Sequence, residues 1–350
     1  PMSSGLMAMI TLLGYAAGLF LLVPLADVAP HRRLVRAMLA VAAVAAATAA
    51  CSPFATLLLA ALFVLGAASS VIQVLVPIAA AMVGPEIRGR VIGDIMGGLM
   101  VGILLSRPLA SLLADTLGWR AFYAASALAS LALGWTLVRG IPDRLPPPGP
   151  RYLDLIVSLG SLLRREPVLR RRAASAALSM AAFSLFWTAV ALRLAQPPYS
   201  VGQRGIAVFA LVGAAAAFIT PWVGRAGDRG WTRPVTAISH LGMIGAFALA
   251  AWAGSAGQGD HAPWITLGLA AVALDAGVTG DQTLGRRAVN LLDPAARSRI
   301  NALFVGLFFL GGAAGSALAG VAWSLGQWQA VCATGAVLGL AALLIPYAPK

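Results

Sequence analysis

Charged residues are scarce in this chain of 350 residues. Only 11% are Asp, Glu, Lys or Arg, whereas 60% are hydrophobic, and the mean hydropathy is +0.86. A soluble globular domain carries about 25% charged residues, so the composition excludes that class and indicates a membrane protein. The 25 basic residues outnumber the 12 acidic ones. They fall between long apolar runs rather than on one polar face, which argues against nucleic-acid binding.

Cysteine is also rare. Cys51 and Cys332 lie in or beside apolar runs in opposite halves of the chain, and we expect two free thiols rather than a disulfide. Neither has a neighbouring histidine or second cysteine, so we expect no metal site. The sequence contains no HExxH, no GxSxG and no phosphate-cradling loop. We therefore expect neither an enzyme nor a bound cofactor.

Long apolar runs fill the rest of the sequence. A run of about 18 or more apolar residues marks a transmembrane helix. Eleven such runs occur, at 5–26, 34–51, 55–83, 91–113, 121–138, 173–195, 206–223, 235–253, 263–284, 300–323 and 329–347. The predicted fold is an all-α polytopic membrane protein that spans the lipid bilayer.

One connection is much longer than the others. Residues 139–172 begin with the proline-rich "IPDRLPPPGPR" and continue with "YLDLIVSLGSLLRREP". The second piece has the pattern of a short amphipathic helix lying at the membrane interface. The sequence thus predicts an N-terminal bundle over 1–139, a linker over 140–172 and a C-terminal bundle over 173–350.

The arginines lie mostly on one side of the predicted membrane. Twenty of the 24 arginines occur in alternate loops, with Lys350 on the same side, whereas the opposite loops contain only Arg120 and Arg204. The positive-inside rule places the arginine-rich loops, the central loop and the C-terminus in the cytoplasm. Pro1 then lies outside, ahead of a helix that runs inward. We expect one further helix upstream and twelve in the parent protein, unless Met2 is the true start.

The two halves of the chain resemble each other. A constant offset of 209 pairs Arg88 with Arg297, Arg90 with Arg299, Gly102 with Gly311, Gln73 with Gln282 and Trp119 with Trp328. Parallel repeats across a long cytoplasmic loop are typical of secondary transporters. The predicted fold therefore consists of two pseudo-symmetric helix bundles.

Several motifs resemble those of the major facilitator superfamily over essentially the whole chain. Asp27 ends a helix ahead of basic residues, and Gly224, Arg225, Asp228 and Arg229 form a second copy closer to that family's loop motif. The segment with Gly98, Gly102 and Pro108 resembles the fifth helix of its efflux-type members. "LDAG" at 274–277 and "DPAARSRINALFVGLFFLGGAAGSALAG" at 293–320 resemble a subgroup labelled arabinose-efflux-permease-like. The sequence departs from the pattern at Val23, Pro30 and Arg107.

This resemblance implies alternating access between the two bundles. It implies proton-coupled export of a small organic solute, with proton-coupled import of a sugar or metabolite as the alternative. We expect a monomer in the inner membrane of a bacterium.

The resemblance also suggests a cytoplasmic gate formed by ion pairs. Its candidate residues are Asp27, Arg32, Arg33, Arg88, Arg90, Asp228, Arg229, Arg297 and Arg299. Alternatively, the arginines only anchor the topology, although this leaves the paired aspartates unexplained. The pairs Gly98–Gly102, followed by Pro108, and Gly311–Gly315 allow helix backbones to approach closely. They serve either as simple packing contacts or as sliding contacts between the halves.

Two carboxylates within the predicted spans are candidates for proton coupling. Asp275 lies twelve residues into a helix that enters from outside, which places it about 18 Å deep. The resemblance makes this the tenth helix, which lines the central cavity. Asp281 ranks second, because it lies nearer the cytoplasmic end, where we expect water to reach it.

Other polar residues in the spans complete the candidates. Gln73 and Gln282 could bind a polar substrate or bond neighbouring helices, and Trp187 could line the cavity or only pack. Arg107 lies about 25 Å from the inner face; it either leans inward toward a carboxylate or anionic substrate group, or snorkels outward. We expect Arg193 to snorkel and His240 to be structural.

Overall fold

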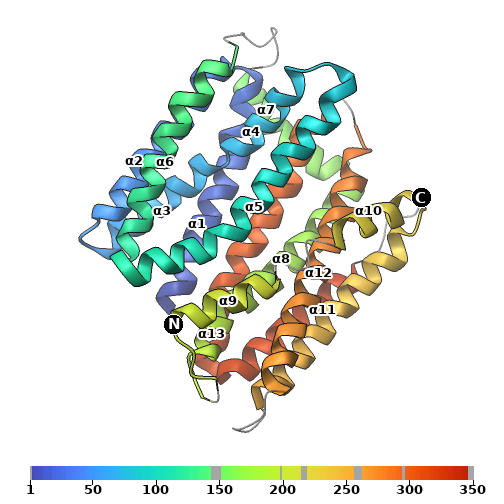
Figure 1. Cartoon of the computed structure of the whole chain (residues 1–350). Coiled ribbons are helices and arrows are strands. Elements are labelled where there is room, and N and C mark those ends of the chain that lie inside the picture. The colour runs from blue at the N-terminus through green and yellow to red at the C-terminus, as the bar shows by residue number, and fades with distance from the viewer. Residues whose placement is uncertain are drawn as a thin grey trace. The chain divides into compact units, whose positions relative to one another are not determined.

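The structure of the chain is a computed structural model that describes residues 2–142, 151–197, 199–213, 219–255, 262–293 and 296–345. The residues in these ranges form helices and connections without strands (Figure 1). In chain order the helices are α1 (Met2–Leu21), η1 (Val23–Asp27), α2 (His31–Cys51), α3 (Ala55–Ser69), α4 (Val71–Ala81), α5 (Pro85–Leu117), α6 (Trp119–Gly140), α7 (Tyr152–Arg165), α8 (Pro167–Leu194), α9 (Gln203–Gly213), α10 (Thr220–Asp228), α11 (Thr232–Ser255), α12 (Ala262–Asn290) and α13 (Arg297–Leu344).

Each predicted span corresponds to helical structure in the residues that the structure describes, so the all-α prediction is confirmed; residues 214–218 of the run 206–223 and residues 346–347 of the last run lie outside them. The predicted run 55–83 is interrupted at Ser70, between α3 and α4. The last two runs are merged in α13, whose backbone leaves the helical conformation at Gly326 and Gln327. By length and composition, seven helices in the described part of the chain are apolar enough to cross a membrane. The runs 91–113, 206–223 and 263–284 correspond to α5, the α9–α10 pair and α12.

Proline and glycine set several helix ends. Pro85 and Pro167 begin α5 and α8, at a position where the missing N–H of proline costs nothing. Gly118 follows the end of α5 with a φ of 84°, a conformation in which glycine is unstrained. These residues set where α5 and α8 begin and where α5 ends.

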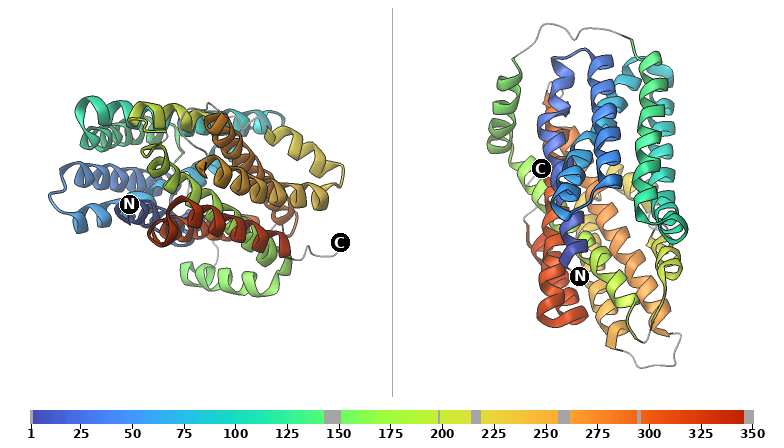
Figure 2. Two further views of the ribbon diagram at one scale, coloured as in Figure 1. Left: turned by 90° about the horizontal axis from the view of Figure 1, so that it is seen from below. Right: turned by 90° about the vertical axis from the view of Figure 1, so that its left-hand side faces the viewer.

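Two compact units make up the chain. One contains residues 1–9 and 161–350, and the other contains residues 10–160. The boundary at Gly160 lies inside α7, which occupies the segment predicted as an amphipathic linker helix. Within the larger unit, α8 packs against α13 and α11 packs against α12; the second pair lies side by side in Figures 1 and 2.

Large apolar side chains are exposed on helices of both units. Leu128 and Trp135 on α6, and Ile238 and Trp252 on α11, are all more than half exposed. A protein in water rarely exposes so much apolar surface, whereas a bilayer solvates it. The chain is a multi-pass membrane protein.

Candidate functional site

Asp275 lies in the middle of α12 and binds an indole group. Nε1 of Trp187, on α8, donates a hydrogen bond of 2.9 Å to Oδ1 of Asp275. Both side chains are half-buried. A partly accessible carboxylate in the middle of an apolar helix is costly and is a functional candidate by default.

Aromatic rings and a glycine surround this pair. The ring of Trp187 contacts Phe183, Phe186 and Phe209, with centroids 5.6–6.2 Å apart. A Cβ added at Gly213, on α9, would lie 2.5 Å from Oδ2 of Asp275 and 2.5 Å from the indole. Three helices therefore form a small polar site with aromatic walls.

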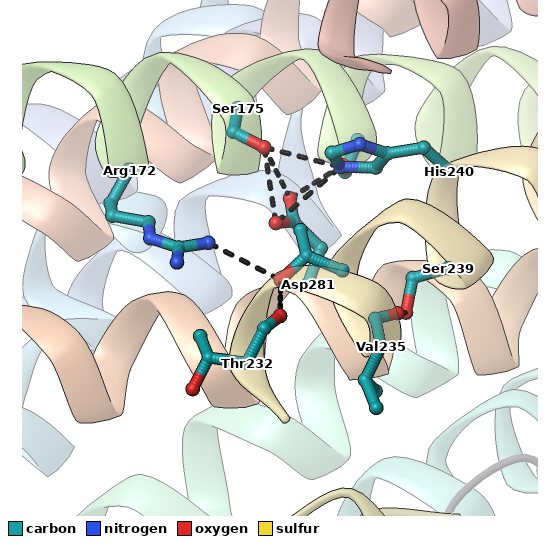
Figure 3. A network of polar contacts seen from close by, with 9 residues as sticks. Arg172, Ser175, Thr232, Val235, Ser239, His240 and Asp281 are labelled. Atoms are coloured by element: carbon teal, nitrogen blue, oxygen red, sulfur yellow. Dashed lines mark hydrogen bonds and ion pairs between the residues drawn. The ribbon is translucent and has the colours of Figure 1, made fainter. Parts of the chain in front are cut away.

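A second polar cluster surrounds Asp281 (Figure 3). Oγ of Ser179 donates to Oδ2 of Asp281 at 2.8 Å, and Oγ of Ser175 lies 3.0 Å from both carboxylate oxygens. Nε2 of His240 lies 3.5 Å from Oδ1 of Asp281 and 3.2 Å from Oγ of Ser175. The serines are on α8, the histidine on α11 and the carboxylate on α12, so the cluster joins three helices.

The prediction that water reaches Asp281 is wrong. Its side chain is 1% exposed, and those of Ser179 and His240 are 0% exposed. Asp281 lies near a helix end, but water does not reach it, because α8 and α11 pack against the face of α12 that carries it.

Arg193 does not snorkel as predicted but binds backbone carbonyls inside the same unit. Its two terminal nitrogens donate to the carbonyl oxygens of Pro197 at 2.6 Å and Gly254 at 2.8 Å. The side chain is 7% exposed, and its guanidinium lies 5.1 Å from the centre of the Tyr199 ring. Burial raises the pKa of the Tyr199 hydroxyl, which Arg193 partly opposes. The hydroxyl thus stays protonated at neutral pH and donates to the carbonyl of Ala253.

We expect Arg193→Met to destabilise this unit. It keeps the apolar stem but leaves two backbone carbonyls without their donor, at about 1–3 kcal/mol each. The melting temperature of the purified chain should fall by several degrees. Arg139→Met is the control, because Arg139 is exposed and lies over the Trp135 ring at 4.1 Å. Equal melting temperatures for the two variants would contradict the carbonyl-binding role.

Comparison with known proteins assigns the fold to a family. The family model described as Major Facilitator Superfamily matches residues 1–285. The chain is 36% identical over 344 residues to "Uncharacterized transporter YgaY" of Escherichia coli O157:H7, covering 98% of this chain and 85% of YgaY. The chain belongs to the major facilitator superfamily. This facilitator is a transporter rather than an enzyme.

Two further comparisons agree with this membership. The facilitator is 34% identical over 341 residues to "Probable transporter SCO4007" of Streptomyces coelicolor, covering 95% of this chain and 76% of that protein. A crystal structure of a point mutant of the nucleoside transporter NupG superimposes with a TM-score of 0.76 at 16% identity. It covers 97% of this chain and 89% of that one. The identity in this last comparison is low, so it supports the fold alone.

One predicted gate residue of the facilitator forms an ion pair with a partner that the sequence did not single out. Asp228, at the end of α10, accepts a 3.2 Å hydrogen bond from Nε of Arg287 on α12, and a second nitrogen lies 3.1 Å away. A Cβ at Gly227 would lie 3.3 Å from Cδ of Arg287. Glycine thus leaves room for the arginine stem. The side chains are 73% and 39% exposed, so this pair inside one unit contributes about 0–1 kcal/mol.

The other gate candidates lie mostly at the surface. The exposed ones are Asp27, Arg33, Arg90, Arg229 and Arg297. Arg32 and Arg299 are half-buried. The side chains of Arg88, Arg107 and Pro108 lie outside the described residues. The gate therefore remains a prediction.

The glycine pair of the second half packs inside one unit. A Cβ added at Gly311 or Gly315 would collide with the backbone of Ala177 or Ala181 on α8. Small residues on both helices thus bring α13 and α8 into backbone contact. Gly98 and Gly102 occupy exposed positions on α5, and their role between the halves stays a prediction.

The two glutamines have different surroundings. Nε2 of Gln73, on α4, donates to the hydroxyl of Tyr15 on α1 at 3.4 Å. This contact favours the alternative in which Gln73 bonds neighbouring helices. Gln282 is half-buried and follows Asp281 on α12.

Sequence reasoning did not identify Ser175, Ser179 or Arg287 and gave His240 only a structural role. The serines were one signal that could have identified the cluster. They lie one turn apart on α8, in a stretch that is otherwise mostly apolar, and a carboxylate and a histidine occur in neighbouring helices. Which of these helices meet was not readable from the sequence.

Proposed function

We propose that this facilitator is a secondary active transporter that exports a small organic solute in exchange for protons. The site formed by Asp275 and Trp187 supports this proposal, since it offers a carboxylate, held by the indole N–H, between aromatic walls. Solute sites are typically apolar pockets with a few placed polar groups. The export direction rests on the resemblance of residues 91–113 to efflux-type helices.

The proposal also assigns the orientation of the chain in the membrane and the roles of its two bundles. The bundles over 1–139 and 173–350 alternate access around the linker 140–172, as a monomer in the inner membrane of a bacterium. The arginine-rich loops face the cytoplasm, where Asp27 and Asp228 lie at the inner gate. The charge asymmetry of the loops supports this orientation.

A flux measurement tests the function. A thermal-shift screen of the purified chain against sugars, drugs and amino acids selects a solute, which is then used labelled in proteoliposomes. With one proton per solute, a pH difference of about one unit supports about a tenfold solute ratio. We expect accumulation opposite to the proton flow, collapsing when a protonophore is added. Accumulation in the direction of proton flow would identify an importer, and flux indifferent to pH would contradict proton coupling.

Cysteine labelling tests the orientation. In a background without Cys51 and Cys332, Arg229→Cys should react with an impermeant maleimide only from the cytoplasmic side. Ser200→Cys, in the exposed connection after α8, should react only from outside. Labelling of both positions from one side would contradict the proposed topology.

A further inference from the structure

Asp281 and His240 form a sealed pair of titratable groups (Figure 3). Nε2 of the histidine lies 3.5 Å from Oδ1 of the carboxylate, and the two side chains are 0% and 1% exposed. Nδ1 of His240 has no hydrogen-bond partner among the described residues. Replacing a buried ion pair by apolar residues is often neutral or stabilising. The free energy of folding therefore does not by itself explain why a buried acidic and a buried basic group occur together here.

The surrounding hydroxyl groups limit how protons are arranged in this pair. Ser179 donates its proton to Oδ2, and Ser175 has one proton to share among three acceptors. Two arrangements carry no net charge: a carboxylate beside an imidazolium, or a carboxyl group beside a neutral imidazole. Each holds one proton more than a carboxylate beside a neutral imidazole. An uncompensated buried charge costs several kcal/mol, so the packed site favours binding one proton.

An arginine lies near this pair of groups. Nη1 of Arg172, on α8, donates to Oγ1 of Thr236 at 3.3 Å, one turn before His240 on α11. The other charged groups at the same ends of the packed helices are Arg170 and Arg171 on α8, Arg233 on α11, Asp228 on α10, Arg286 and Arg287 on α12, and Arg297 and Arg299 on α13. Through Thr236, Arg172 thus places a cation one turn of α11 away from His240.

Close packing links the proton to the arrangement of the helices. A Cβ at Gly277, on α12, would lie 2.5 Å from the carbonyl oxygen of Ser239 on α11, and Gly280 packs on the same residue. Hydrating the carboxylate therefore requires α8 or α11 to move away from α12. When the pair holds its proton, it favours the packed arrangement of α8, α11 and α12. When the pair has lost its proton, it favours an arrangement in which these helices are separated and the carboxylate is hydrated.

We propose that Asp281 and His240 together carry the coupling proton of the transport cycle. The pair holds the proton while α8, α11 and α12 are packed, and releases it from Oδ1 or Nε2 to water when these helices separate. This assignment rests on the proposed function, and it leaves Asp275 as the residue that contacts the solute.

Proton counting tests the pair without any solute. The purified full chain is titrated in detergent between about pH 5 and pH 9, and bound protons are compared between variants. We expect Asp281→Asn to bind about one proton fewer than the wild-type chain. His240→Gln should keep this proton on the carboxyl group. Asp94→Asn, which changes an exposed carboxylate on α5, is the matched control and should leave the count unchanged. An unchanged count in Asp281→Asn overturns the proposal.

If Asp281→Asn fails to fold, NMR of the imidazole nitrogens tests the same proposal. The chain contains three histidines, so the imidazole signals of His240 are identified by their loss in His240→Gln. These signals should change over the same pH range in the wild-type chain. Signals that do not respond overturn the proposal.

Transport separates this inference from the proposed function. Asp281→Asn should lose accumulation driven by a pH gradient while solute exchange without a gradient continues. If the wild-type chain responds to the gradient and Asp281→Asn responds equally, the inference fails and the proposed function stands. If the wild-type chain does not respond, the proposed function fails, and the proton count alone decides whether the pair binds a proton.

Discussion

Replacing Asp275 by asparagine is expected to lower both solute binding and every mode of transport. The amide oxygen of asparagine can still accept the hydrogen bond from Trp187, so folding should persist. The substitution removes the negative charge of the carboxylate that accepts a hydrogen bond from the solute. A hydrogen bond to a charged group contributes about 1.5–3 kcal/mol. The expected loss in affinity is therefore about tenfold to a hundredfold. It is measured as the solute-dependent thermal shift and as flux in proteoliposomes.

The pattern across variants makes this prediction specific. Asp275→Asn should impair exchange as well as gradient-driven flux, whereas Asp281→Asn should impair only the latter. Trp187→Phe keeps an aromatic ring but removes the indole donor, and should weaken binding less than Asp275→Asn. Asp94→Asn should transport normally. An Asp275→Asn chain with wild-type binding would exclude Asp275 as the solute contact.

Substituting leucine for Gly311 is expected to disrupt the larger unit. A Cβ at this position already overlaps the backbone of Ala177, and a leucine side chain would force α13 away from α8. Overpacking costs typically about 1–3 kcal/mol, and more where backbone rather than a flexible side chain must yield. We expect a loss of about 3 kcal/mol or more, seen as a low yield of monodisperse protein and a lower melting temperature.

The same substitution elsewhere in the unit provides the control. Gly245, on α11, is exposed, and apart from the neighbouring backbone of α11 no described atom lies within 4 Å of a Cβ added there. Gly245→Leu should change stability by less than about 1 kcal/mol, since a leucine there faces outward and improves helix propensity. Equal effects of the two substitutions would show that close packing of α13 on α8 is not what Gly311 provides.

The sequence by itself determined the features that depend on local composition. A bilayer requires each spanning segment to satisfy its own backbone and to present apolar side chains, so long runs such as 121–138 and 173–195 identify helices without reference to a partner. The arginine asymmetry and the internal repeat are likewise properties of the chain alone, and they led to the facilitator family. The central position of Asp275 followed from counting residues along one helix.

Only the tertiary structure decided which polar groups meet. An amphipathic helix in water shows its buried face as a stripe, but a membrane helix is apolar all round, so its rotation is not readable from the pattern. Rotation is what buries Asp281 against His240 and the serines of α8, and what turns Arg193 toward Gly254. These contacts join residues 61–106 positions apart. They depend on the packing of whole helices, whereas the helices themselves depend only on their own residues.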